Sequence, residues 1–189
     1  MVLGVYCAGG LGGYVIEMAK VINEKQRRWD NIFFINDFEP AIDTDEVVIT
    51  FDDFYSSYPP DKAEIIIASG EPNSREKLFE KVKSFGYRLP NLVDPLTDLK
   101  KIKVMGEGNI IEDYVHISSS NVTIGNNNVF MTFSRIAHDS VVGSHCVFAS
   151  YAAISGRTVV EDRCYVGTGA KVRDKIKIGK NSIIGMCAA

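Results

Sequence analysis

The chain has 189 residues, of which 46% are hydrophobic and 24% are charged, as is ordinary for a folded protein in water. Its 21 basic and 24 acidic side chains give a formal net charge of −3, which argues against a nucleic-acid-binding surface or a module for anionic membranes. Four cysteines without a CxxC pair indicate no metal site and no disulfide framework. With no apolar run near the ~20 residues of a membrane span and no secretory signal, we expect a cytoplasmic protein.

Short apolar runs alternate with helical segments over the first half of the chain. The runs are continuous rather than alternating, which favours strands buried on both faces of a parallel sheet. We therefore predict a small Rossmann-like parallel α/β domain over residues 1–98. Its strands are expected at 1–7, 32–36, 46–51 and 64–68, and its helices at 13–23 and 74–85.

A repeat of six residues runs through the second half of the chain. From Ile124 to Ile184 every sixth residue is a large apolar one, eleven in succession. An α-helix cannot keep this period on one face, because its turn has 3.6 residues. Each hexad is instead a short strand and a corner, and three hexads close a triangular coil whose large residues point inward, with coils about 4.8 Å apart. The pattern predicts a left-handed parallel β-helix over residues 99–189.

The first coil does not share this register. Val104 and Ile110 fit the repeat only after an offset of two residues, which predicts an irregular corner within 111–121. Small side chains two residues before most inward positions are expected to let the chain pass the corners. Cys146 and Cys164 occupy two of these positions, so we interpret them as packing residues rather than nucleophiles.

The eighteen-residue coil also converts sequence spacing into contacts. His138 comes two residues after the inward Ile136, so its side chain is expected to face outward from a corner, next to Gly156 one coil on. An imidazole beside a bare backbone N–H can accept a proton while the amide stabilises an oxyanion, and Asp139 can orient the ring. Corner positions also tolerate polar side chains without a function, so spacing alone leaves both interpretations open.

A glycine-rich segment separates the first strand from the first helix. Gly9, Gly10, Leu11 and Gly12 let the backbone approach a phosphate at the helix N-terminus. Asp37 follows the second strand, where an acid can meet ribose hydroxyls. The full GxGxxG spacing is absent, so the segment also fits a tight turn without a ligand.

Four segments resemble one family. The hexads are similar to those of the hexapeptide-repeat acyltransferases. The whole chain looks like the branch that begins with a small Rossmann-like domain, namely the sugar-nucleotide N-acetyltransferases and sialic acid O-acetyltransferases. The similarity is carried by CAGGLGGYVIEMAK at 7–20, IIIASGEPNSREKL at 65–78, IAHDSVVG at 136–143 and ISGRTVVEDRCYVGTGAKV at 154–172.

This resemblance implies a reaction. In such enzymes the residue at His138 deprotonates a sugar amine or hydroxyl as it attacks acetyl-CoA, the acid at Asp139 supports the ring, and the N–H at Gly156 faces the oxyanion. The N-terminal domain is expected to hold the nucleotide of a UDP-sugar, with Gly70 and Glu71 in a nearby loop. Coenzyme A is expected between two subunits of a homotrimer, near Gly143, Ser155, Gly156, Gly167, Thr168 and Lys171.

Three positions depart from the family pattern. Val147 stands where many relatives have a second histidine, Met131 where an asparagine is common, and Leu11 where the glycine-rich loop often has a histidine. The first two changes concern acceptor recognition and the third concerns nucleotide contact. The sequence also stops at IIGMCAA, before the further coil of such enzymes, so we expect a shortened form or a coenzyme A site that is incomplete at that end.

The leading hypothesis is an acetyl-CoA-dependent acetyltransferase that acts on the amine of a UDP-linked amino sugar in surface glycan synthesis. O-acetylation of sialic acid or another sugar is the alternative among enzymes. A non-catalytic nucleotide-binding β-helix scaffold is the alternative outside them. The set of His138, Asp139 and Gly156 favours an enzyme, because a scaffold has no use for it, whereas Val147 and Met131 favour a scaffold or a different acceptor.

Overall fold

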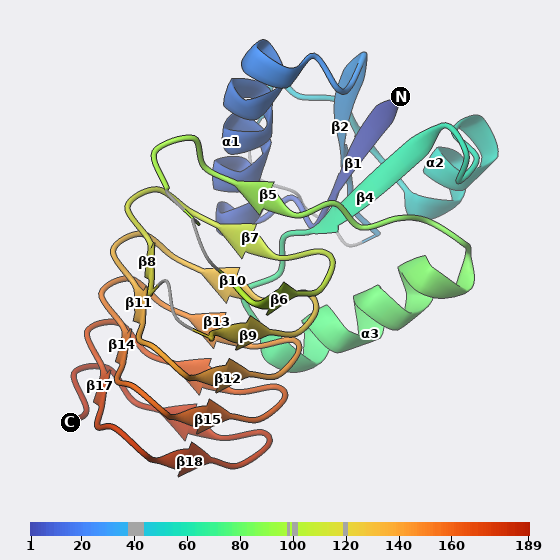
Figure 1. Ribbon diagram of the computed structural model, residues 1–189. Coiled ribbons are helices and arrows are strands. Elements are labelled where there is room, and N and C mark those ends of the chain that lie inside the picture. Colours follow the sequence, from blue (N-terminus) through green and yellow to red (C-terminus); the bar gives the residue numbers. More distant parts are fainter. Residues whose placement is uncertain (38–43, 98, 100–101, 119–120) are drawn as a thin grey trace.

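The computed structural model describes residues 1–37, 44–97, 99, 102–118 and 121–189, in two parts (Figure 1). The first part confirms the predicted Rossmann-like domain, with a four-stranded parallel sheet of order β3-β2-β1-β4. None of the helices within the described residues is long and apolar enough to cross a membrane. The elements of this part are β1 (Val2–Tyr6), α1 (Gly10–Gln26), β2 (Asn31–Ile35), β3 (Val48–Ile49), α2 (Phe51–Ser57), β4 (Ala63–Ile67) and α3 (Pro72–Ser84).

The predicted strand at 46–51 is the least accurate of these elements. Only Val48–Ile49 forms β3, because Thr50 caps a helix that the sequence analysis does not predict. The Thr50 side chain accepts a hydrogen bond from the third backbone N–H of α2 (3.1 Å). Phe51 and Phe54 are fully buried on this helix. A helix of seven residues shows too little periodicity to be distinguished from a strand.

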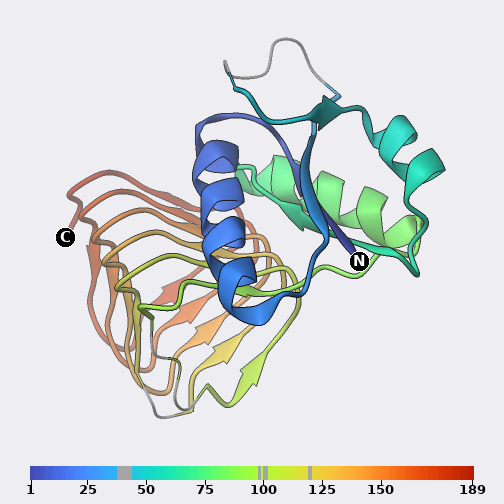
Figure 2. The same ribbon diagram turned by 90° about the horizontal axis from the view of Figure 1, so that it is seen from above.

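Helices cover both faces of the sheet (Figure 2). α1 packs on the face that carries Leu3 and Val5, whereas α2 and α3 pack on the opposite face, which carries Tyr6. The chain passes from β1 to β2 and β3 on one side and then crosses back through α2 to place β4 on the other side of β1, so the strand order reverses between β1 and β4. Ligands of such sheets bind beside the carboxyl ends of the strands at this switch point. The loops after β1 and β4 are therefore the candidate ligand loops.

The second part is a left-handed β-helix of two-residue strands, as predicted. Its three parallel sheets form the sides of a triangular prism. Most pairs join residues eighteen apart, such as Phe130 with Phe148, whose rings stack in the buried core. Sheet B contains β5 (Leu92–Val93), β7 (Ile110–Ile111), β10 (Val129–Phe130), β13 (Val147–Phe148), β16 (Tyr165–Val166) and β19 (Ile183–Ile184). Sheet C contains β6 (Val104–Met105), β9 (Thr123–Ile124), β12 (Val141–Val142), β15 (Val159–Val160) and β18 (Lys177–Ile178), and sheet D contains β8 (His116–Ile117), β11 (Arg135–Ile136), β14 (Ala153–Ile154) and β17 (Lys171–Val172).

The first coil corrects the predicted offset. Met105 and Ile111, not Val104 and Ile110, face the core of the prism, and Ile110 points outward into the cluster that includes α1. β6, β7 and β8 each pair with strands nineteen residues on, so a single extra residue lies between β8 and β9. The offset is one residue rather than two. Residues 119–120 of this irregular segment lie outside the described residues.

Each corner of the prism turns at a residue with a left-handed backbone. Such residues recur every six positions, for example Asn127 (φ 55°), Phe133 (φ 59°) and Asp139 (φ 57°). The residue after most of them is buried, as are Ser134 and Ser140, which confirms that short side chains pass through the corners; Ile176, after Lys175, is 42% exposed. We name the corners after the sheets that they join: B/D, D/C and C/B.

One apolar cluster and one polar network join the two parts. Outward residues of β5, β7, β10 and β13 pack against α1. At the C/B corner, the fully buried Arg75 of α3 donates to the backbone carbonyl (2.8 Å) and the side-chain oxygen (2.5 Å) of Asn127. β5 pairs with β7 although it lies within 1–98. Since residues 98, 100 and 101 lie outside the described residues, the domain boundary at 98/99 stays a prediction.

Candidate functional site

His138 lies at the D/C corner with 47% of its side chain exposed. Its Nδ1 is 2.8 Å from Oδ2 of Asp139, and Nδ2 of Asn121 donates to the other oxygen of this carboxylate (3.1 Å). The hydrogen bond with His138, and next that with Asn121, hold the pKa of Asp139 below its ordinary value. When Nδ1–H donates to the carboxylate, Nε2 keeps its lone pair and can accept a proton.

Gly156 lies against the imidazole ring from the next coil. A Cβ atom at this position would be 2.7 Å from Nε2 of His138 and 2.8 Å from its Cε1. Real Cβ contacts are not this short, so the ring can lie here only because residue 156 is glycine. The structure brings together His138, Asp139 and Gly156, as their spacing predicts. Their catalytic roles stay a prediction.

The backbone N–H of Gly156 lies two residues after the inward position of its hexad. At two such positions of the C/B corner, a side chain one coil on accepts this N–H: Ser144 Oγ accepts from Asn126 (3.0 Å), and Asp162 Oδ1 accepts from Ser144 (2.9 Å). Among the residues that the structure describes, no group accepts a hydrogen bond from Gly156 N–H. A donor without a partner, beside a proton-accepting Nε2, is available to an oxyanion.

A pocket of about 250 Å³ opens beside this group. Four exposed cations lie near it on sheet D and the D/C corner, namely Arg135, Lys171, Arg157 and Lys175, and within the described residues none of them forms an ion pair. Such a surface attracts a ligand that carries phosphates. The pocket is lined by Arg135, Ala137, His138, Ala153, Ile154, Ser155 and Gly156.

The residues predicted to bind coenzyme A lie around all three corners of the prism. Only Ser155 and Gly156 line the pocket beside His138. The others are Lys171 on sheet D, Gly167 and Thr168 at the B/D corner, and Gly143 at the C/B corner. One chain does not bring these residues together, and their role stays a prediction.

The glycine-rich segment forms the loop after β1 and the first turn of α1. At Gly9 and Gly10 the space that a side chain would fill is open, whereas a Cβ at Gly12 would be 2.1 Å from the carbonyl oxygen of Cys7. Gly12 therefore serves close packing. No acidic residue lies in the first turn of α1, so its N-terminus suits an anion such as a phosphate. Gly70 lies in the neighbouring loop, after β4, and is equally open.

Asp37 is already engaged within its own domain. Its carboxylate accepts hydrogen bonds from the Tyr6 hydroxyl, the Phe51 N–H (2.8 Å) and the Lys81 ammonium (2.9 Å). Burial alone would raise the pKa of Asp37, but these hydrogen bonds outweigh burial and hold it below its ordinary value. The carboxylate thus fixes the start of α2, and a ribose hydroxyl would have to compete with these donors.

The three departures from the family pattern meet in the cluster between α1 and sheet B. Val147 is fully buried there, and Leu11 and Met131 pack against the same cluster. Three positions at which the resemblance implies polar side chains are therefore apolar and lie in one region. Any acceptor group that reaches this region meets apolar side chains.

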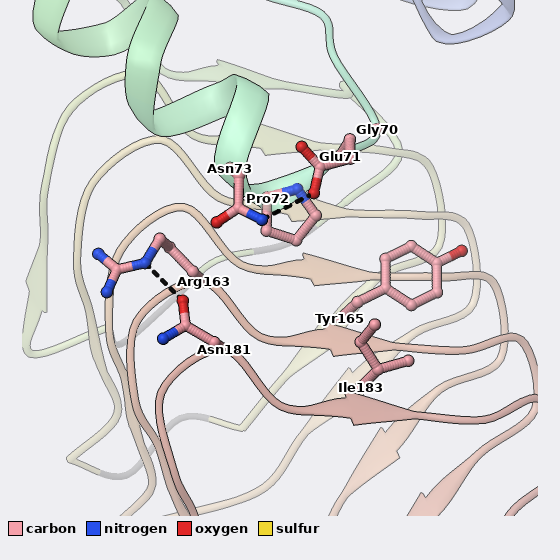
Figure 3. A pocket seen from close by; sticks show the side chains of 8 residues that line it. All are labelled: Gly70, Glu71, Pro72, Asn73, Arg163, Tyr165, Asn181 and Ile183. Atoms are coloured by element: carbon pink, nitrogen blue, oxygen red, sulfur yellow. Dashed lines mark hydrogen bonds between the residues drawn. The ribbon is translucent and has the colours of Figure 1, made fainter.

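A second pocket, of about 180 Å³, lies where the β4–α3 loop meets sheet B (Figure 3). Of its lining residues, the sequence analysis names only Gly70 and Glu71. Tyr165 and Ile183 line it from β16 and β19, at outward positions of their hexads. An apolar residue at an outward position is the sequence signal that could identify such residues.

The two candidate regions of one chain lie on different sides of the prism. α1 lies along one side of the prism (Figure 2), which is the side of sheet B, whereas His138 occupies the corner that sheet B does not touch. A nucleotide at the loops after β1 and β4 is therefore separated from His138 of the same chain by the width of the prism.

Two family models match the sequence. Residues 121–156 match the bacterial transferase hexapeptide (six repeats) model, and residues 3–82 match the model of the PglD N-terminal domain. A search of curated proteins finds no match. The two matched segments fall in the two parts of the structure.

Solved structures match nearly the whole chain. WeeI from Acinetobacter baumannii AYE is 29% identical with a TM-score of 0.87, covering 98% of this chain and 89% of that one. The acetyltransferase domain of PglB from Neisseria gonorrhoeae FA1090, in complex with acetyl coenzyme A, is 22% identical with a TM-score of 0.87, covering 100% and 89%. PerB from Caulobacter crescentus, in complex with CoA and GDP-perosamine, is 21% identical with a TM-score of 0.83, covering 99% and 87%. At 22% and 21% identity, the similarity to the PglB domain and to PerB shows that this chain has the same fold.

Proposed function

Because the chain belongs to the hexapeptide-repeat acyltransferases that begin with a PglD-type domain, we propose that it transfers an acetyl group from acetyl-CoA to the amine of a UDP-linked amino sugar. The observation that carries the proposal is the contact between His138 and Gly156, where a proton-accepting Nε2 lies beside a backbone N–H without a partner among the described residues. The basic surface around this contact suits the phosphates of the acyl donor.

The reaction has two steps. The amine nitrogen attacks the thioester carbonyl carbon, and Nε2 of His138 takes the proton that the amine loses. Asp139 stabilises the resulting imidazolium, and Gly156 N–H donates to the oxyanion of the tetrahedral intermediate. The intermediate then collapses with cleavage of the carbon–sulfur bond. The imidazolium returns its proton to the departing thiolate, which leaves an amide and the thiol of coenzyme A.

The acceptor enters from the N-terminal domain. The accessible N-terminus of α1 and the open loop at Gly70 favour the phosphates of a sugar nucleotide. Since these loops lie across the prism from His138 of the same chain, the reaction needs a second copy, in accord with a homotrimer. One copy then supplies the acceptor loops and another supplies His138. Such sharing is also in accord with predicted coenzyme A residues at both the D/C corner and the B/D corner.

The test is release of thiol from acetyl-CoA with a panel of acceptors. The panel contains UDP-4-amino sugars, other UDP-amino sugars, a GDP-amino sugar and free sialic acid, each with the wild type and His138→Ala. We expect turnover on a UDP-amino sugar and its loss in the variant, by about 10²–10⁴-fold. Turnover only on sialic acid would replace N- by O-acetylation. Binding of UDP without turnover on any acceptor would favour the scaffold.

A further inference from the structure

Glu112 is a buried carboxylate that has no cation beside it. Two acidic side chains are buried within the described residues, namely Glu64 at 4% exposure and Glu112 at 6%. Glu64 forms an ion pair with Arg28 (2.8 Å) and accepts a hydrogen bond from the indole N–H of Trp29 (3.0 Å). Among the same residues no cation pairs with Glu112, whose carboxylate accepts one hydrogen bond, from the Thr132 N–H to Oε2 (2.8 Å). Buried charges in proteins are normally paired, so Glu112 lacks an expected cation.

The second oxygen of this carboxylate can be reached from outside. In the part of the chain that the structure describes, no group donates to Oε1 of Glu112. The only enclosed side-chain oxygen or nitrogen without a hydrogen bond in this part is Oγ of Ser134, so Oε1 is not enclosed. An uncharged glutamine would accept the Thr132 N–H equally well. The hydrogen bond to Thr132 therefore does not explain why the residue is an acid.

Glu112 lies on the side of the acceptor loops. By the pairing of β7 with β10, it is next to Met131 at the B/D corner. Met131 packs against the same cluster as Leu11 of the glycine-rich segment. One residue along the chain from Glu112, Asp113 accepts a hydrogen bond from the hydroxyl of Tyr14 in α1 (3.1 Å). The carboxylate of Glu112 is thus at the edge of the apolar cluster that α1 covers.

We propose that Glu112 binds the ammonium group of the acceptor and takes its first proton, so that the enzyme acts on an amine and not on a hydroxyl. This inference rests on the proposed function, in which one copy supplies the acceptor loops and another supplies His138. A sugar amine has electron-withdrawing oxygens nearby, as a chain N-terminus has its carbonyl, and such amines have a pKa of about 8. The acceptor is therefore mostly an ammonium at neutral pH, and its charge complements a buried carboxylate without a cation.

The proton balance of the reaction requires a second base. An ammonium nitrogen carries three protons, and the nitrogen of the product amide carries one. His138 takes one proton as the amine attacks and returns it to the thiolate. The other proton must leave before the attack, because an ammonium nitrogen has no lone pair. Oε1 of Glu112 takes this proton: the N–H bond breaks, an O–H bond forms, and the nitrogen keeps the electron pair. Glu112 then gives the proton to water when the product leaves.

The surroundings of Glu112 suit this exchange. Burial raises its pKa to about 7, and the negative charges of Asp113 and of Asp94, which follows β5, add to this effect. Tyr14 faces it from α1, and burial raises the pKa of this phenol, so Tyr14 stays neutral. A base whose pKa is close to the working pH can both take up and release a proton during each turnover.

The first test measures binding without acetyl-CoA. By calorimetry at neutral pH, we expect the wild type to bind a UDP-4-amino sugar at least about tenfold more tightly than the UDP-sugar with a hydroxyl at the same carbon. Glu112→Gln keeps the size of the side chain and an oxygen for the Thr132 N–H, and it should bind the two sugars equally. Asp113→Asn, which loses the same charge one residue away, is the matched control and should keep the preference. Equal binding or no binding of the two sugars by the wild type, or an unchanged preference in Glu112→Gln, would overturn the proposal.

The second test is the pH dependence of turnover. We expect Glu112→Gln to lower kcat/KM by about 10²-fold near pH 7. The loss should shrink to about threefold or less near pH 9.5, where the amine has lost its proton without help. A merely structural role would give the same loss at both pH values. Turnover on amino sugars with an equal loss at both, or with none, would refute the role of Glu112 and leave the proposed function standing. A preference for the amine in binding without any turnover would refute the proposed function instead.

Discussion

His138 and Gly156 are in contact across two coils, and a Cβ on the glycine would be 2.7 Å from Nε2 of the imidazole. Since the histidine is half exposed, an added methyl group would displace its ring rather than the coil. We expect Gly156→Ala to lower kcat/KM by about 10²–10⁴-fold, the range for loss of a positioned general base, because alanine keeps the backbone N–H but displaces the imidazole, with little change in Tm. Thiol-release kinetics and thermal unfolding measure both effects. Full activity of this variant would show that the reaction does not need the imidazole ring in its contact with residue 156.

Asp139 determines which nitrogen of His138 accepts the proton. Asp139→Asn keeps the size of the side chain but loses the charge that faces Nδ1 at 2.8 Å. The loss can reach about 10⁴-fold in kcat for a buried orienting acid; we expect less here because the Asp139 side chain is 42% exposed. KM for acetyl-CoA should not change. Asn121→Gly removes the second hydrogen bond of the carboxylate and suits the left-handed backbone of this position (φ 53°), so it is the graded control and should have a smaller effect.

Glu112 provides a test through pH. Burial raises its pKa to about 7, although its carboxylate accepts the Thr132 N–H at 2.8 Å. An acid whose pKa is higher in the folded state costs stability once it ionises, so this cost is absent below pH 4.5 and grows as the pH rises toward 7. We expect Glu112→Gln to raise the free energy of unfolding by roughly 1–3 kcal/mol at pH 8 and to leave it unchanged near pH 4.5. Urea unfolding at the two pH values measures the difference, and an equal effect at both would contradict burial as the cause.

The β-helix is predictable because its period is local and repeated. One register from Ile124 onward determines which residues face the core, and the eighteen-residue coil then places His138 beside Gly156. The first coil is less predictable, since Ile110 and Ile111 are both apolar and only the docking of α1 shows which of them faces out.

Other parts of the site depend on contacts between distant segments. Tyr165 and Ile183 line a pocket only because the β4–α3 loop lies over sheet B, and no local pattern encodes this position. Asp37 follows a strand as predicted, yet its carboxylate is taken by Tyr6, Phe51 and Lys81 from three other elements. Sequence spacing therefore predicts contacts within the repeat well, but it predicts contacts between the two parts of the structure poorly.

Arg75 holds the acceptor loop to the β-helix. It is fully buried, and burial lowers its pKa to about 9. Its guanidinium donates to the carbonyl oxygens of Ile67 and Ser69, both at 2.8 Å, and to Asn127. Asn127 Nδ2 donates back to the carbonyl of Arg75 (2.9 Å). One side chain therefore connects the end of β4, the loop that carries Gly70, and the C/B corner.

Replacing Arg75 by methionine keeps much of the length of the side chain and removes the guanidinium that donates to Ile67, Ser69 and Asn127. Each buried acceptor left without a partner costs roughly 1–3 kcal/mol, so we expect Arg75→Met to lower the free energy of unfolding by at least about 3 kcal/mol. Arg88→Met, at an exposed arginine, should change it by less than about 0.5 kcal/mol. In protein that stays folded, KM for the sugar nucleotide should rise more than KM for acetyl-CoA, because the loop at Gly70 loosens while the pocket at His138 does not contain Arg75. A parallel rise of both constants would show that Arg75 supports the fold as a whole and does not position the acceptor loop.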